Sequence, residues 1–136
     1  MLALALFLAA LAPLATRAVA QVSGVEVTAS HPWTEIKNDT YEQRAHFADG
    51  TGRMMAKLDR EIRELHDKRA GMTTDTKDWD FLMKDVDDSR ALLVGRIEDI
   101  SKTTTPETWA DAKDKVGDAW HRAQQAVDKM NSARTS

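Results

Sequence analysis

The sequence predicts an all-α protein, built as an up-down-up antiparallel bundle of three coiled-coil-like helices. Apolar residues recur at intervals of three and four in three separate stretches, which is the spacing of amphipathic helices. Short segments with glycine, threonine or proline separate these stretches. Charged residues make up 30% of the chain, and glycine and proline are few. Such a composition suits helices with charged outer faces.

The first twenty residues have the pattern of a secretory signal peptide. An apolar run that Pro13 interrupts ends in the small-residue cleavage pattern Ala18-Val19-Ala20. No Lys or Arg precedes this run, so an uncleaved anchor stays open as an alternative. We therefore expect a signal peptide at residues 1–20, a flexible leader at residues 21–38, and a periplasmic or secreted protein.

The charge balance of the remaining chain is acidic. Cleavage after Ala20 would remove one arginine and no acidic residue, which leaves 18 basic and 22 acidic residues and a net charge of −4. This charge argues against nucleic acid as a partner, because phosphate binding needs a basic surface. The chain contains no cysteine, which excludes disulfides and thiol catalysis.

The bundle is expected to span residues 39–132, and its first helix is predicted from the apolar residues Met55, Leu58, Ile62, Leu65 and Met72. The same register extends backwards to Ala48 and Tyr41. The intervening Asp49-Gly50-Thr51-Gly52 is poor helix material, because each glycine costs about 1 kcal/mol relative to alanine. The helix either continues through this stretch, which the unbroken register favours, or begins near Arg53. Gly71 suits a left-handed residue at the helix end.

The second and third helices follow from similar patterns. The second begins near Thr74 or Asp75 and carries its apolar residues at Trp79, Leu82, Val86, Leu93, Ile97 and Ile100, with a weak point at Ser89 or Arg90. The third begins with Thr105 as cap and Pro106 in the first helical position. It is expected to end near Met130, before a disordered tail at residues 133–136.

An eleven-residue repeat defines one face of the third helix. Eleven residues make almost three helical turns, so Trp109 and Trp120 lie about 20° apart around the axis. Val116 and Val127 fall on the same side. This face is either the core of the bundle or a surface for lipid or a protein partner. Its candidate residues are Trp109, Val116, Trp120 and Val127, with Lys113, Lys115 and Arg122 along the edges.

The sequence contains no recognisable catalytic motif, and we expect no enzyme activity and no cofactor. Two carboxylate–imidazole pairs three residues apart, His46 with Asp49 and Asp118 with His121, would form a metal site only if they converged. Solvated polar faces are the simpler interpretation of both pairs, so no metal site is predicted.

Three segments resemble a family of bacterial coiled-coil proteins described as stress-response proteins: KLDREIRELHDKRA, RALLVGRIEDI and TWADAKDKVGDAWHRAQQAVDKM. Members of that family commonly end in a helix with a Trp, Lys, Ala and Trp pattern. Here this pattern falls on Trp109, Lys113, Ala119 and Trp120. The resemblance covers residues 54–130 and implies a non-enzymatic, envelope-associated or stress-linked helical protein. The chain departs from the family in its export signal and in Trp79.

These observations favour an exported, non-enzymatic scaffold or binding protein that packs its helices against a protein partner or a second copy of itself. The first alternative is a lipid-binding protein that uses the face of Trp109 and Trp120. The remote alternative is a metal-binding helical protein that uses His46, Asp49, Asp118 and His121.

Overall fold

The computed structural model describes residues 31–135, and the predicted signal peptide lies outside this described part. Within residues 31–135 the chain is all-α and contains no strand. Its elements are α2 (Pro32–Ile36), the short 3₁₀ turn η1 (Tyr41–Gln43), α3 (Arg44–Ala70), α4 (Lys77–Ser101) and α5 (Pro106–Thr135). The predicted all-α class is confirmed, but this part of the chain has four α-helices where the sequence predicted three.

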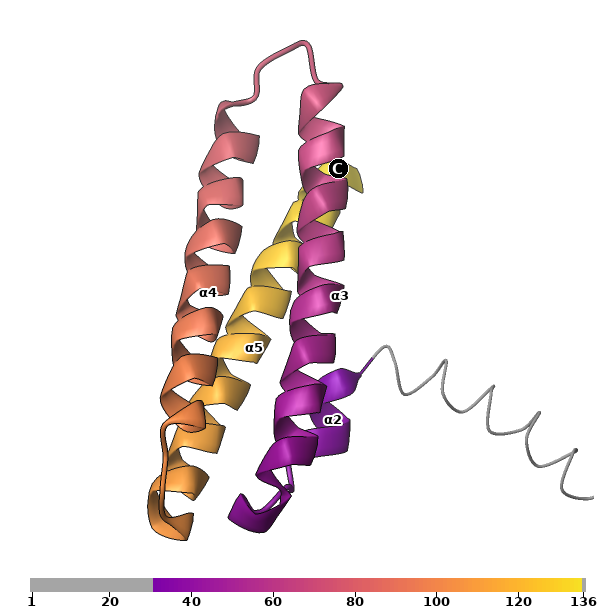
Figure 1. Ribbon diagram of the computed structural model, residues 1–136. Coiled ribbons are helices and arrows are strands. Elements are labelled where there is room, and N and C mark those ends of the chain that lie inside the picture. Colours follow the sequence, from indigo (N-terminus) through magenta and orange to yellow (C-terminus); the bar gives the residue numbers. More distant parts are fainter. Residues whose placement is uncertain (1–30, 136) are drawn as a thin grey trace, which may run out of the picture.

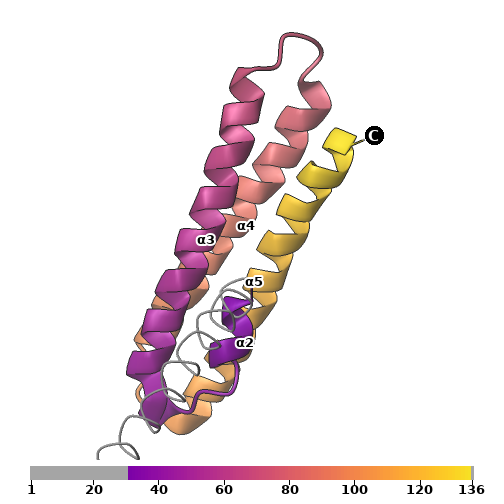
Figure 2. The ribbon, with the colours of Figure 1, turned by 90° about the vertical axis from the view of Figure 1, so that its right-hand side faces the viewer.

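The three long helices lie side by side, and the chain direction alternates from α3 to α4 to α5 (Figure 1). Helices α4 and α5 make the most extensive contact of any helix pair in the described part. Small buried side chains on these two helices, including Ser89, Ala119 and Ala123, permit their close approach. The view in Figure 2 shows the short α2 next to α3 and α5.

Helix α3 continues without a break through Asp49-Gly50-Thr51-Gly52, which confirms the interpretation that the register favoured. The predicted register was partly wrong. Met54 is fully buried and Met55 only half-buried, while Phe47 is buried in place of the exposed Ala48. The correct stripe runs from Phe47 through Met54 to Leu58. Met54 and Met55 both fit the spacing to Leu58, at four and three residues, and Phe47 on the Met54 side packs against Trp33 of α2.

Helix α4 carries a core stripe that differs from the predicted one at two positions. Its buried residues are Trp79, Met83, Val86, Ser89, Leu93 and Ile100. Leu82 and Ile97 are half-buried. Ser89 fits the core because its hydroxyl donates a hydrogen bond of 2.7 Å to the carbonyl of Asp85, which leaves no unpaired polar hydrogen. Ser89 is therefore a position in the apolar stripe of α4 at which a small side chain permits close approach to α5.

The helix ends are partly as expected. Helix α5 begins at Pro106, and the amide of Thr108 donates a hydrogen bond of 3.3 Å to Oγ1 of Thr105, as the predicted cap requires. Gly71 follows α3 but has a right-handed backbone with φ of −87°, so the left-handed prediction was wrong. The second helix begins at Lys77, slightly later than predicted.

Two predicted irregular segments are helical. Residues 32–36, which were assigned to a flexible leader at residues 21–38, form α2, and Ile36 is fully buried. That part of the leader prediction is wrong, and residues 21–30 lie outside the described part. Helix α5 also continues beyond Met130 to Thr135, so residues 133–135 of the predicted disordered tail are helical.

Candidate functional site

The apolar residues of the eleven-residue repeat lie in the hydrophobic core. Trp109 and Trp120 are 4% and 5% exposed, and Val116 and Val127 are also buried. Their burial agrees with the interpretation of this face as core. In this conformation the four side chains present no surface to lipid or to a partner.

The three basic residues along this face are paired with protein groups. Nζ of Lys113 donates a hydrogen bond of 2.8 Å to the backbone carbonyl of Asp39. Lys115 forms an ion pair with Asp111 at 3.2 Å, and Arg122 lies 3.8 Å from Asp85. The last two pairs are at the surface, where such interactions contribute about 0–1 kcal/mol. Lys113 is therefore held against the fold, whereas the side chains of Lys115 and Arg122 remain 52% and 56% exposed.

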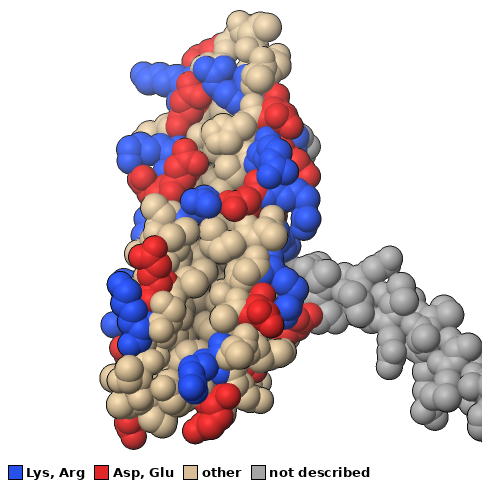
Figure 3. Space-filling model, viewed as in Figure 1, with Lys and Arg blue, Asp and Glu red and all other residues tan. Residues whose placement is uncertain are grey.

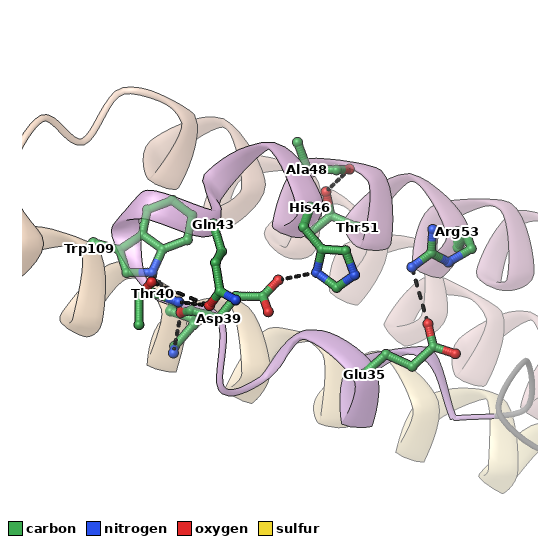
Figure 4. A network of polar contacts seen from close by, with 10 residues as sticks. Glu35, Asp39, Thr40, Gln43, His46, Ala48, Thr51, Arg53 and Trp109 are labelled. Carbon is green, nitrogen blue, oxygen red and sulfur yellow. Dashed lines mark hydrogen bonds and ion pairs between the residues drawn. The ribbon is translucent and has the colours of Figure 1, made fainter.

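Asp39 lies in the segment after α2 and contacts residues of both α3 and α5 (Figure 4). Its backbone carbonyl accepts a hydrogen bond of 3.1 Å from Nε1 of Trp109 as well as the bond from Lys113. Its carboxylate lies 2.7 Å from Nδ1 of His46 on α3. Asp39 is only 6% exposed, so these contacts satisfy polar groups that have left water.

Four aromatic rings pack edge to face around this segment. The chain of contacts runs from Trp33 to Phe47, from Phe47 to Trp109, and from Trp109 to Tyr41. The ring centroids are 5.0 to 6.1 Å apart, the range in which such pairs are favourable. We call Trp33, Asp39, Tyr41, Phe47 and Trp109 the α2 cluster. It joins α2, α3 and α5 at one end of the long helices.

Two glycines make room for α2. A methyl group at Gly50 would overlap with Cγ2 of Ile36 and would lie 2.9 Å from its Cδ1. A methyl group at Gly117 would lie 2.5 Å from the ring of Trp33. Gly50 belongs to α3 and Gly117 to α5, so the two large side chains of α2 rest on bare backbone of both helices. This explains a glycine inside each helix, where it otherwise costs stability.

The four candidate metal ligands do not form a metal site. His46 pairs with Asp39 instead of the predicted Asp49. All four of His46, Asp49, Asp118 and His121 are exposed. No group of three or more His, Asp or Glu side chains within residues 31–135 is arranged to hold a metal ion.

A polar network between α3 and α5 was not predicted. Nζ of Lys57 donates to Glu61 at 3.1 Å and to Gln124 at 2.9 Å, and Nε2 of Gln124 donates to Glu61 at 3.2 Å. The Lys57 ammonium also lies 5.6 Å from the ring centroid of Trp120. The spacing of Lys57 and Glu61 shows an ordinary helix pair, but nothing in the sequence points to Gln124. The network constrains the position of α3 relative to α5 along the helix axes.

Three ion pairs shift the pKa values of surface groups. The hydrogen bond from Arg69 lowers the pKa of Asp80 below its ordinary value. The hydrogen bond to Asp88 raises the pKa of Lys84, and the hydrogen bond to Asp59 raises the pKa of Arg90. Each shift stabilises the charged form that is already present at neutral pH. These groups are held as ion pairs and are not poised for proton transfer.

One apolar pocket opens between α3 and α4 next to the α2 cluster. It has a volume of about 230 Å³. Its lining residues are Arg44, Ala45, Phe47, Ala48, Thr51, Ile97, Ile100, Ser101, Thr103 and Trp109. Arg44 is the one charged residue among them. Figure 3 shows that the surface between α3 and α4 is largely uncharged and is bordered by charged side chains on both sides.

A second surface surrounds Phe81 on α4. Phe81 is 74% exposed and is the one large hydrophobic side chain exposed to this degree within the described residues. With Leu82, Lys84, Asp85, Asp88 and Lys129 it borders a shallow groove of about 390 Å³ between α4 and α5. We call these six residues the Phe81 surface. It was not among the predicted sites, although an aromatic residue outside the apolar stripe of α4 was a visible signal.

No protein-family model, curated protein or solved structure matches this chain. None of the helices within residues 31–135 has an apolar stretch long enough to cross a lipid bilayer.

Proposed function

We propose that the chain is an exported, non-enzymatic scaffold or binding protein that acts through helix packing with a protein partner or a second copy of itself. In this proposal α3, α4 and α5 form a self-supporting three-helix bundle that α2 completes. The export assignment rests on residues 1–20, and the envelope or stress association rests on the resemblance of residues 54–130.

The exposure of Phe81 carries the proposal. Phe81 leaves in water most of the roughly 150–250 Å² that an aromatic side chain can bury, which favours association. Aromatic residues are also frequent anchors at the centre of protein interfaces. Lys84, Asp85 and Asp88 surround it with both signs of charge, which suits a polar interface rim.

The lipid-binding alternative has less support. Trp109 and Trp120 would reach a bilayer only if α5 left the core, and the hydrogen bond from Trp109 to Asp39 opposes that movement. The metal-binding alternative has no convergent ligand group among the described residues.

The experiment that tests the proposal compares Phe81→Ser with Ala91→Ser in the full chain. Ala91 is exposed on the same helix and lies outside the Phe81 surface, so it is a matched control. Sedimentation velocity measures self-association, and a photo-cross-linking residue at position 81 traps a partner in the native cells. We expect association or a discrete cross-link that Phe81→Ser removes and Ala91→Ser retains. A monomer that forms no discrete cross-link at position 81 would contradict the proposal.

A further inference from the structure

The pocket between α3 and α4 has a buried apolar floor and a small-residue mouth. Phe47, Ile100 and Trp109 form the floor and are at most 4% exposed. Ala45 and Ala48 lie on the exposed side of α3 and line the opening. Long side chains at these two positions would cover the pocket, as helical side chains extend along the helix surface. The two alanines leave it open to solvent.

Water in this pocket has few hydrogen-bond partners. The three hydroxyl groups of the lining donate to carbonyls of their own helices or helix ends: Thr51 to Ala48 at 2.8 Å, Ser101 to Glu98 at 2.6 Å and Thr103 to Ile100 at 2.8 Å. Their hydrogens are therefore used. The hydroxyl oxygens can still accept, but most of the lining is apolar, so an apolar group that displaces water here costs few hydrogen bonds.

The charge at the mouth has one sign. Arg44 donates from Nη1 to the carbonyl of Tyr41 at 3.1 Å, and its guanidinium lies 4.4 Å from the Tyr41 ring centroid. It forms no ion pair with a carboxylate within residues 31–135. A guanidinium has five donors in a planar fork, which matches a carboxylate.

The helix dipoles set the orientation of a bound anion. Arg44 opens α3 and Trp109 lies in the first turn of α5, where the dipoles are positive, whereas Ile100 and Ser101 close α4, where the dipole is negative. The guanidinium adds its charge on the α3 side, so an anionic group is favoured there. The apolar body of the same ligand would then contact Ile97, Ile100 and Trp109 on the other side.

We propose that this pocket binds a small apolar carboxylate, with the carboxylate at Arg44 and a single ring or branched aliphatic group on the floor. The volume of about 230 Å³ sets the size class. A cavity of about 150 Å³ holds benzene, so one ring with a short substituent fits. This site is separate from the Phe81 surface and does not depend on the proposed function.

The test is a titration of the full chain with 3-phenylpropionate and with the neutral 3-phenylpropanol. Binding is followed by the indole N–H resonances in a heteronuclear NMR spectrum. Trp109 lines the pocket and Trp79 does not, so the Trp109 resonance should shift at saturation and the Trp79 resonance should stay fixed. We expect the alcohol to bind about tenfold more weakly than the acid, because it lacks one charge-assisted hydrogen bond.

Three variants test the charged contact and the apolar contact of this site separately. Arg44→Gln should weaken 3-phenylpropionate about tenfold and leave the alcohol unchanged, since only the charge contact is lost. Ala48→Leu should abolish binding of both, and Ala56→Leu, at an exposed position of α3 outside the lining, should change neither. Circular dichroism checks that each variant stays folded. No saturable Trp109 shift at millimolar ligand, or equal binding by the acid and the alcohol, would overturn the proposal, as would binding that survives Ala48→Leu.

Discussion

Two tryptophans at opposite ends of the long helices have different surroundings. Trp109, in the α2 cluster, donates its indole N–H to the carbonyl of Asp39 and contacts the rings of Phe47 and Tyr41. Trp79, near the loop from α3 to α4, is 7% exposed, and its Nε1 has no hydrogen-bond partner among the described residues. Both indoles are buried, but only one has its polar group satisfied.

The difference shows which end of the long helices is held by more specific contacts between side chains. At the α2 end, α2 adds the side chain of Ile36 and the ring of Trp33 where α3 and α5 meet, and the segment after α2 adds the carbonyl of Asp39. At the loop end, an exposed ion pair between Arg69 and Asp80 connects α3 and α4. We conclude that the docking of α2 on two glycines, and not the helix stripes alone, determines the geometry of the Trp109 end.

The largest expected effect comes from truncation of the α2 anchor. Ile36→Ala removes a fully buried side chain that rests on Gly50. Deletions of this kind cost about 2–5 kcal/mol of unfolding free energy, because the cavity collapses only partly. Urea unfolding followed by circular dichroism measures the loss. The control is Thr34→Ala, at an exposed position of the same helix. If Ile36→Ala were as stable as this control, α2 would not be docked.

The two tryptophans themselves allow a sharper comparison. Trp109→Phe removes the indole donor from the Asp39 carbonyl, which keeps its hydrogen bond from Lys113. We expect a cost of about 1–3 kcal/mol, from a net hydrogen bond of about 0.5–1.5 kcal/mol plus lost packing. Trp79→Phe removes a polar hydrogen that has no partner, so its packing loss is offset and the net cost is smaller. Thermal unfolding of both variants gives the two values. An equal or larger cost for Trp79→Phe would remove the proposed contrast between the ends.

The smallest expected effect is on the pH dependence at the loop end. The pKa of Asp80 lies below its ordinary value of 3.8 because Arg69 donates to the carboxylate. A lowered folded-state pKa contributes stability that is present above the unfolded value and is lost as the pH falls through the folded value. Asp80→Asn lacks this contribution. The free energy of unfolding of the wild type should therefore fall slightly more steeply with decreasing pH than that of Asp80→Asn. Chemical unfolding at several pH values from about 2 to 5 measures both slopes. Identical slopes would contradict the ion pair.

Much of the helical framework was predictable because it depends on local chemistry. Thr105 and Pro106 define the start of α5 by capping and by a fixed φ angle. The three-and-four spacing of Leu58, Ile62 and Leu65 selects one face of α3 in any context. These signals lie within a few residues of the structure they determine.

The α2 end was not predictable from the same kind of signal. A five-residue helix is too short to show a period, so Pro32–Ile36 resembled a loop. From the local sequence, Gly50 and Gly117 only indicate positions where a helix is weakened. The residues that require these glycines, Ile36 and Trp33, are distant in sequence. The pocket beside Phe47 also depends on three separate helices. Only the packed structure connects these positions.

Two glycines of α3 test most directly whether α2 docks on bare backbone. A methyl group at Gly50 overlaps Ile36, whose branched side chain is stiff, whereas a methyl group at Gly52 meets nothing within 4 Å. Alanine is favoured over glycine by about 1 kcal/mol in a helix, and overpacking costs about 1–3 kcal/mol. We therefore predict that Gly52→Ala raises the midpoint of thermal unfolding and that Gly50→Ala lowers it. A rise of equal size in both variants would show that α2 does not rest on α3, which contradicts the docking described above.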